Sequence, residues 1–142
     1  MLLQDFNAAY FTIEDRAPVI VLTIIRPSLS EEDNIEQFGF ELTKLVEHSG
    51  RTWMALDFTQ VKILTSSAVG KLISLHRNLH RRGGRMALCG VNDFIRQVLL
   101  TANLDDYFHI KSSVEEAVDY LKQQIAPTES TTLTGRVVQP RS

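Results

Sequence analysis

The chain of 142 residues contains a single cysteine, Cys89. One cysteine excludes an internal disulfide bond and a zinc site built from several cysteines. Long apolar runs are also missing, since the longest, Val19 to Ile25, is far too short to cross a bilayer. The formal net charge is only −2, so the composition gives no electrostatic argument for binding DNA, RNA or anionic lipid.

The residues that are present suffice for one ordinary hydrophobic core, because 44% of them are hydrophobic. Residues 1–126 are predicted to form one domain, and the Thr- and Ser-rich segment 127–142 to be a disordered tail. Residues 1–6 lack the basic start of a signal peptide, so we expect a cytoplasmic protein. Cys89 lies in an apolar run and is interpreted as a small buried hydrophobe, not a nucleophile.

Apolar periodicity predicts strands that alternate with helices. Strands are predicted at Ala9–Glu14, Val19–Ile25, Trp53–Leu56, Arg85–Gly90 and Tyr107–Ile110. Helices are predicted from Asp33, from Ser66 to the pair Gly83-Gly84, around residues 94–99, and from Ser113. Two of these helix starts carry a capping-box pattern, Asp33 with Glu36 and Ser113 with Glu116. This order predicts an α/β domain with a largely parallel central sheet.

The most informative segment is residues 57–70, which joins a buried strand to an amphipathic helix. Its paired serines, Ser66 and Ser67, are predicted at the helix N-terminus, where unpaired N–H groups meet the positive end of the helix dipole. Serine is a favoured N-cap worth about 1 kcal/mol, so capping alone explains the pair. A phosphate on Ser66 would also be well tolerated at that place.

Common catalytic and cofactor motifs are absent. There is no Gly-x-Ser-x-Gly, no Gly-x-Gly-x-x-Gly and no Walker lysine loop. His76 and His80 share one helix face, but their arginine neighbours Arg77, Arg81 and Arg82 favour a solvated basic face over a metal site. No aromatic residue is interleaved with this patch, as stacking on nucleic-acid bases would require. By elimination, the chain is interpreted as a binding module and not an enzyme.

Three segments carry a resemblance to a known family. They are Leu56–Gly70, Arg82–Val91 and Leu100–Phe108, and their order and spacing resemble those of a STAS domain of the bacterial anti-sigma factor antagonist type. The resemblance covers residues 9–125. It implies the STAS fold, an α/β fold with a mixed, mostly parallel central sheet of four to five strands and about four helices.

The resemblance also implies a partner switch that regulates transcription. In that family an anti-sigma factor that is also a serine kinase phosphorylates the serine at the helix start, and a PP2C-type phosphatase resets it. The unphosphorylated form binds the anti-sigma factor and frees the sigma factor. Carried over, the acceptor is Ser66, with Ser67 and Thr65 less favoured. No cofactor, metal, DNA or membrane is implied, and a monomer or weak dimer is expected. The implied partner contacts are Lys62, Leu64, Thr65, Ser66, Ser67, Ala68 and Val69.

Two positions depart from the family motif Asp-Ser-Ser/Thr-Gly. Thr65 stands where the motif has Asp, and Ala68 stands where it has Gly. Loss of the carboxylate removes a charge beside the acceptor, and Ala68 raises helix propensity by up to about 1 kcal/mol. The alternative function is therefore a STAS scaffold or interaction module in a bacterial signalling complex that is not phosphorylated.

Overall fold

The computed structural model describes residues 3, 6–104 and 106–131. Its main sheet has the strand order β1-β2-β4-β6-β7. β1 pairs antiparallel with β2, and the other neighbours pair in parallel. This architecture confirms the expected mixed, mostly parallel sheet of the STAS fold. The strands of this sheet are β1 (Phe11–Arg16), β2 (Val19–Ile24), β4 (Trp53–Asp57), β6 (Arg85–Cys89) and β7 (Ile110–Lys111).

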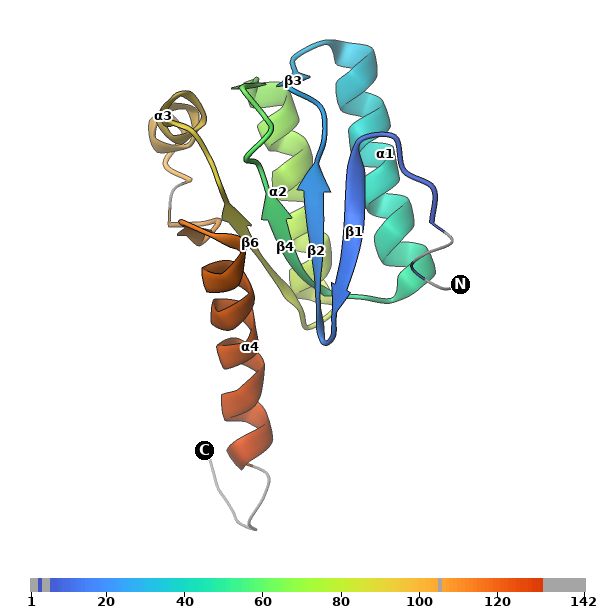
Figure 1. Ribbon diagram of the computed structural model, residues 1–142, viewed down its shortest axis with the longest axis vertical. Helices are drawn as coiled ribbons and strands as arrows, with labels where there is room; N and C mark the ends of the chain where they lie inside the picture. Colours follow the sequence, from blue (N-terminus) through green and yellow to red (C-terminus); the bar gives the residue numbers. More distant parts are fainter. Residues whose placement is uncertain (1–2, 4–5, 105, 132–142) are drawn as a thin grey trace.

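Helices cover both faces of the sheet, as Figure 1 shows. α1 (Glu32–Ser49) and α2 (Ser66–Arg81) pack on one face, and α4 (Val114–Thr131) packs on the other. α3 (Asp93–Thr101) lies near one edge, against the short strand β5 (Ile63–Leu64). Alternate strand residues point to opposite faces, so β2 is buried on both sides and reads as a continuous apolar run.

β1 begins two residues later than the sequence predicts, because Ala9 and Tyr10 have a different hydrogen-bond partner. The Glu41 carboxylate on α1 accepts the backbone N–H of Ala9 at 2.8 Å and that of Tyr10 at 3.1 Å. Glu41 is only 6% exposed. Its burial is tolerated because both of its oxygens are hydrogen-bonded, and it ties the chain before β1 to α1.

The predicted capping box of α1 is wrong. The helix begins at Glu32, and its N-cap residue Glu31 makes no side-chain capping bond. Asp33 lies inside the first turn, where its charge complements the helix dipole instead of accepting a capping bond.

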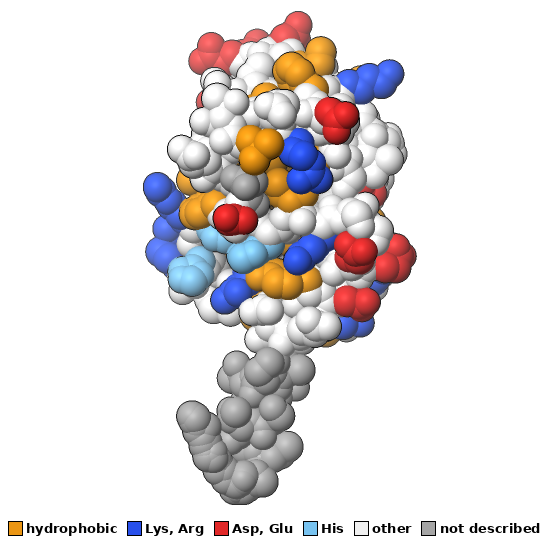
Figure 2. All heavy atoms as spheres, turned by 90° about the vertical axis from the view of Figure 1, so that its left-hand side faces the viewer, with side chains coloured by type: hydrophobic (Ala, Val, Ile, Leu, Met, Phe, Trp, Pro, Cys, Tyr) orange, Lys and Arg blue, Asp and Glu red, His pale blue; other side chains and the backbone are white. Residues whose placement is uncertain are grey.

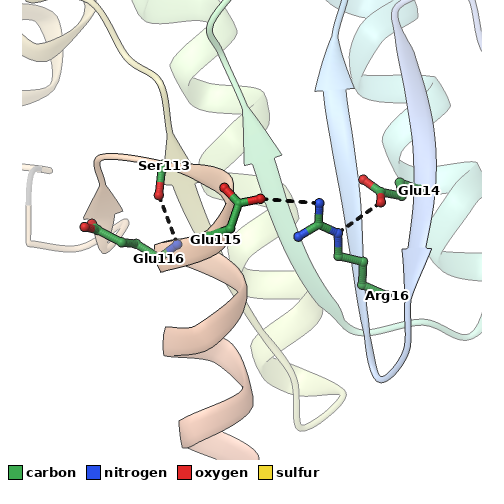
Figure 3. Close-up of polar contacts among 5 residues, drawn as sticks. All are labelled: Glu14, Arg16, Ser113, Glu115 and Glu116. Carbon is green, nitrogen blue, oxygen red and sulfur yellow. Dashed lines mark hydrogen bonds and ion pairs between the residues drawn. The ribbon is translucent and has the colours of Figure 1, made fainter.

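The predicted cap of α4 is confirmed. Glu116 N donates to Ser113 Oγ at 3.1 Å (Figure 3). The Glu116 carboxylate accepts from the backbone N–H and the hydroxyl of Ser112. Next to this cap, Arg16 on β1 contacts Glu115 at 3.6 Å and so connects the edge strand to α4. The helix runs to Thr131, five residues beyond the predicted domain end at Ala126. Residues 132–142 of the predicted tail lie outside the described residues.

The end of α2 and the last strand follow from backbone geometry. Gly83 adopts φ 83°, and Gly84 N donates to Leu79 O at 2.8 Å, which closes the helix as the glycine pair predicts. β7 begins at Ile110, later than the predicted strand at 107–110. His109 has φ 54°, a left-handed conformation that an extended strand cannot include.

Candidate functional site

The predicted site lies at the carboxyl ends of the parallel strands, where α2 begins (Figure 1). The chain leaves β4 at Asp57 and reaches α2 through a second, two-stranded sheet made by β3 (Ser28–Leu29) and β5. Leu29 pairs with Leu64, and Thr65 N then donates to Leu29 O at 3.2 Å. This small sheet therefore sets the position of the first residues of α2.

Thr65 is the N-cap residue of α2. Its backbone is extended, with φ −91° and ψ 166°, and its Oγ1 accepts a hydrogen bond from Ala68 N at 3.4 Å. The interpretation of the serine pair as the cap is wrong, because Ser66 and Ser67 are already the first two helical residues. Both serine side chains are exposed, and neither hydroxyl is hydrogen-bonded to a described residue.

The start of α2 is electrostatically suited to an anion. Among the described residues, the N–H groups of Ala68 and Val69 donate to Thr65, whereas those of Ser66 and Ser67 have no acceptor. The first turn contains no acidic residue. Two free donors and the positive end of the helix dipole therefore meet beside the Ser66 hydroxyl.

Ser66 borders an apolar groove of about 350 Å³ between α2 and α3. The rest of the lining comes from Val69 on α2 and from Phe94, Gln97, Val98, Thr101 and Ala102 on or just after α3. No charged side chain lines this groove. The ring of Phe94 is 53% exposed, so the groove offers an apolar surface beside the serine.

Ser67 faces a different, polar groove of about 550 Å³ between α1 and α2. Its lining includes Glu32, Glu36 and Lys71, and Lys71 Nζ contacts a Glu36 carboxylate oxygen at 3.0 Å. The two adjacent serines therefore border different surfaces, Ser66 the apolar groove and Ser67 the polar one. A charge added to one would alter a different surface from a charge added to the other.

The other predicted contact residues divide into exposed and supporting ones. Lys62 is exposed, and its carbonyl accepts from Asn92 Nδ2 at 3.2 Å. Leu64 and Ala68 are buried, so their side chains pack in the core and anchor the start of α2. Val69 is 3% exposed and still forms part of the groove wall.

Phe94 and Asn92 belong to this surface and were not among the predicted contacts. Asn92 caps α3 by accepting from Ile95 N at 2.8 Å, and its amide also holds the loop before β5. A signal for Phe94 existed in the sequence. Phe94 and Ile95 are adjacent in a helix, so both cannot face the core, and Ile95 is fully buried.

The predicted solvated histidine face is only half correct. His80 is exposed, but the His76 ring packs on Tyr107 with centroids 4.4 Å apart. Burial lowers the pKa of His76, and nearby His109, His80 and Arg85 lower it further. Within the described residues no group of three or more His, Cys, Asp or Glu side chains could hold a metal ion.

The part of the chain that the structure describes contains no helix with both the length and the apolarity needed to span a bilayer.

Burial, together with the Asp57 and Glu115 carboxylates, raises the pKa of the Cys89 thiol to about 12, as expected for a structural cysteine.

Comparison with known proteins places the fold. A similar curated protein, the sodium-independent sulfate anion transporter of Bos taurus, is 34% identical over 83 residues, which are 58% of this chain and 14% of the transporter. The chain thus spans about a seventh of that relative's length. The anti-sigma factor antagonist SpoIIAA in its unphosphorylated form superposes with a TM-score of 0.68 at 21% identity, covering 80% of this chain and 96% of SpoIIAA. Bacillus SpoIIAA in the phosphorylated form gives a TM-score of 0.61 at 22% identity, covering 78% and 97%.

The family assignment does not depend on these three likenesses. The STAS domain family model matches residues 10–117, which include every strand of the main sheet and the start of α4. The chain therefore belongs to the STAS domain family.

Proposed function

We propose that this chain is a cytoplasmic anti-sigma factor antagonist that switches partners through phosphorylation of Ser66. Its partner is a serine kinase that acts as an anti-sigma factor, and a PP2C-type phosphatase reverses the modification. The unphosphorylated chain, a monomer or weak dimer, binds the kinase through the start of α2. The chain itself carries out no catalysis.

The observation that carries the proposal is the position of Ser66. Its exposed hydroxyl is free of hydrogen bonds to described residues, two unpaired N–H groups lie beside it, and it borders the apolar α2–α3 groove. An exposed, unbonded hydroxyl is accessible to a kinase. The named relative SpoIIAA has been captured in both unphosphorylated and phosphorylated forms, which supports the same chemistry here.

A phosphate on Ser66 would not destabilise the free chain but would lower its affinity for the partner. In the free chain it is solvated and lies at a helix N-terminus, which favours negative charge. In the complex, a partner that packs on the apolar groove would strip water from a group of nearly two negative charges. A cost of about 4 kcal/mol lowers affinity roughly a thousandfold, and no change of fold is needed.

Intact-mass spectrometry with site mapping on protein from its own host tests the proposal. We expect one phosphate, located on Ser66 and not on the adjacent Ser67 or Thr65. Affinity capture should then compare Ser66→Ala, Ser66→Glu and the matched control Ser67→Glu. Ser66→Ala should retain the partner kinase constitutively, Ser66→Glu should lose it, and Ser67→Glu should retain it because that charge lies over the polar groove. Phosphate found only at other residues, or equal loss from both glutamate variants, would contradict the proposal.

A second candidate is a STAS interaction module without a phosphoryl switch. It is favoured by Thr65, which replaces the acidic residue of the family motif, and by the identity shared with a transporter over 83 residues. In this case the protein remains unmodified in every growth condition, and Ser66→Ala and Ser66→Glu capture the same proteins equally.

A further inference from the structure

The second half of α2 and the segment after it form an acid-free stretch. Residues 72–92 contain no Asp or Glu but contain four arginines and two histidines. The sheet brings two further basic residues, His109 and Lys111, next to this stretch, since β7 pairs with β6. Figure 2 shows histidine side chains beside Lys and Arg side chains on this face, with Asp and Glu side chains also among them. We call this set the arginine–histidine surface; its members are His76, Arg77, His80, Arg81, Arg82, Arg85, His109 and Lys111.

The arginines of this surface form no ion pair within the described part of the chain, whereas Lys111 lies near Glu116, whose pKa its charge helps to lower. The ion pairs found there involve Arg16, Arg51 and Lys71, and none involves a member of the arginine–histidine surface. Arg85 donates to two neutral groups, the Tyr120 hydroxyl at 3.5 Å and Gln124 Oε1 at 3.0 Å.

Positive charges surround two histidines of this surface. Burial is the largest cause that lowers the pKa of His76 and of His109, and positive neighbours, Arg85 in both cases, lower it further. Asp106 is the one described carboxylate that opposes this effect on His109. The helix dipole favours cations only in the last turn of α2, where His80 and Arg81 lie, so it does not explain Arg85, His109 or Lys111.

We propose that the arginine–histidine surface is a docking site for an acidic peptide segment of a partner protein. Exposed guanidinium groups at positions 77, 81 and 82 match carboxylates with two parallel hydrogen bonds each. Arg81, at the far end of α2, lies roughly 22 Å from Ser66 along the helix axis, and Arg77 lies about 16 Å from it. A partner bound here leaves the Ser66 groove open, so this site works whether or not Ser66 is phosphorylated.

The structure favours a peptide over a nucleic acid. Single-stranded nucleic acid binds when bases stack on free aromatic faces. The two rings of this region are already covered, since His76 packs on Tyr107 and the Lys111 ammonium lies 4.4 Å from the centroid of Tyr120. The net charge of −2 also repels a long polyanion that extends beyond the surface, whereas a short acidic peptide contacts only the cations.

NMR titration of the full-length chain with a decaglutamate peptide tests this site at about 20 mM and about 300 mM salt. We expect amide shifts confined to residues 76–85 and 109–111 at low salt, and a clear loss of affinity at high salt. The double variant Arg77→Gln, Arg81→Gln should bind about tenfold more weakly. Its unfolding midpoint should be unchanged, because neither arginine has an ionic partner among the described residues.

The matched control is Arg96→Gln on α3, which removes an exposed arginine outside the surface. It should bind the peptide as the parent chain does. Shifts scattered over the molecule, equal weakening by the control, or tighter binding of a single-stranded RNA of equal charge would each overturn the proposal.

Discussion

The capping of α2 gives the sharpest test of the structure. Replacing Thr65 by Ala removes the hydroxyl that accepts from Ala68 N and that also donates to Leu29 O, both at 3.4 Å. Loss of an N-cap typically costs 0.5–2 kcal/mol, and these long bonds suggest about 1 kcal/mol. For a domain of this size the melting temperature should fall by about 3–5 °C. Ser66→Ala removes an exposed, unbonded hydroxyl and should change stability by less than about 0.5 kcal/mol.

Urea unfolding followed by circular dichroism measures both variants, with two further substitutions as controls. Thr65→Val keeps the shape and loses the hydroxyl, so it should match Thr65→Ala. Thr65→Asp keeps an acceptor for Ala68 N and adds a charge that the helix dipole favours, but it cannot donate to Leu29 O, so it should be more stable than Thr65→Ala. The capping argument is refuted if Ser66→Ala destabilises the chain as much as Thr65→Ala.

Two predictions concern titratable groups. Because the pKa of Cys89 is raised from 9.0 to about 12, its thiolate fraction near pH 8 is about a thousandfold lower than that of a free thiol. Iodoacetamide should therefore label Cys89 slowly in the folded chain and faster once urea unfolds it. Equal labelling rates in the folded and unfolded states would contradict this prediction. The pKa values of His76 and His109 are lowered by burial, so the unfolded chain binds more protons below about pH 6.5 and stability should fall as the pH is lowered from there. His76→Gln should reduce this slope and the exposed control His48→Gln should not, as urea midpoints at about pH 7.5 and about pH 5.5 would show.

Much of the fold was predictable because its signals are local. The periodicity around Val69, Leu72 and Leu79 determines that this segment is an amphipathic helix, and the glycine pair after it determines where the helix ends. The same reasoning placed Ser66 at the helix start, which is confirmed. The mostly parallel pairing of the strands was also predicted, since alternating strands and helices favour parallel neighbours.

Errors occurred where a distant partner decides between local alternatives. Ala9 and Tyr10 could have extended β1, but Glu41, more than thirty positions away, accepts both of their N–H groups. His76 lies on a basic helix face by sequence, yet packs on Tyr107 because the chain returns beside α2 after α3.

The sequence by itself determined that a hydroxyl-rich helix start follows the central strand, because helix periodicity and turn residues act over only a few positions. Only the tertiary structure decided which hydroxyl caps the helix and what each serine faces. The β3–β5 pairing places Thr65 at the cap, α3 provides the apolar wall beside Ser66, and α1 provides the polar wall beside Ser67. These neighbours come from segments far apart in the chain, so their contacts exist only after the sheet and both helix layers have packed.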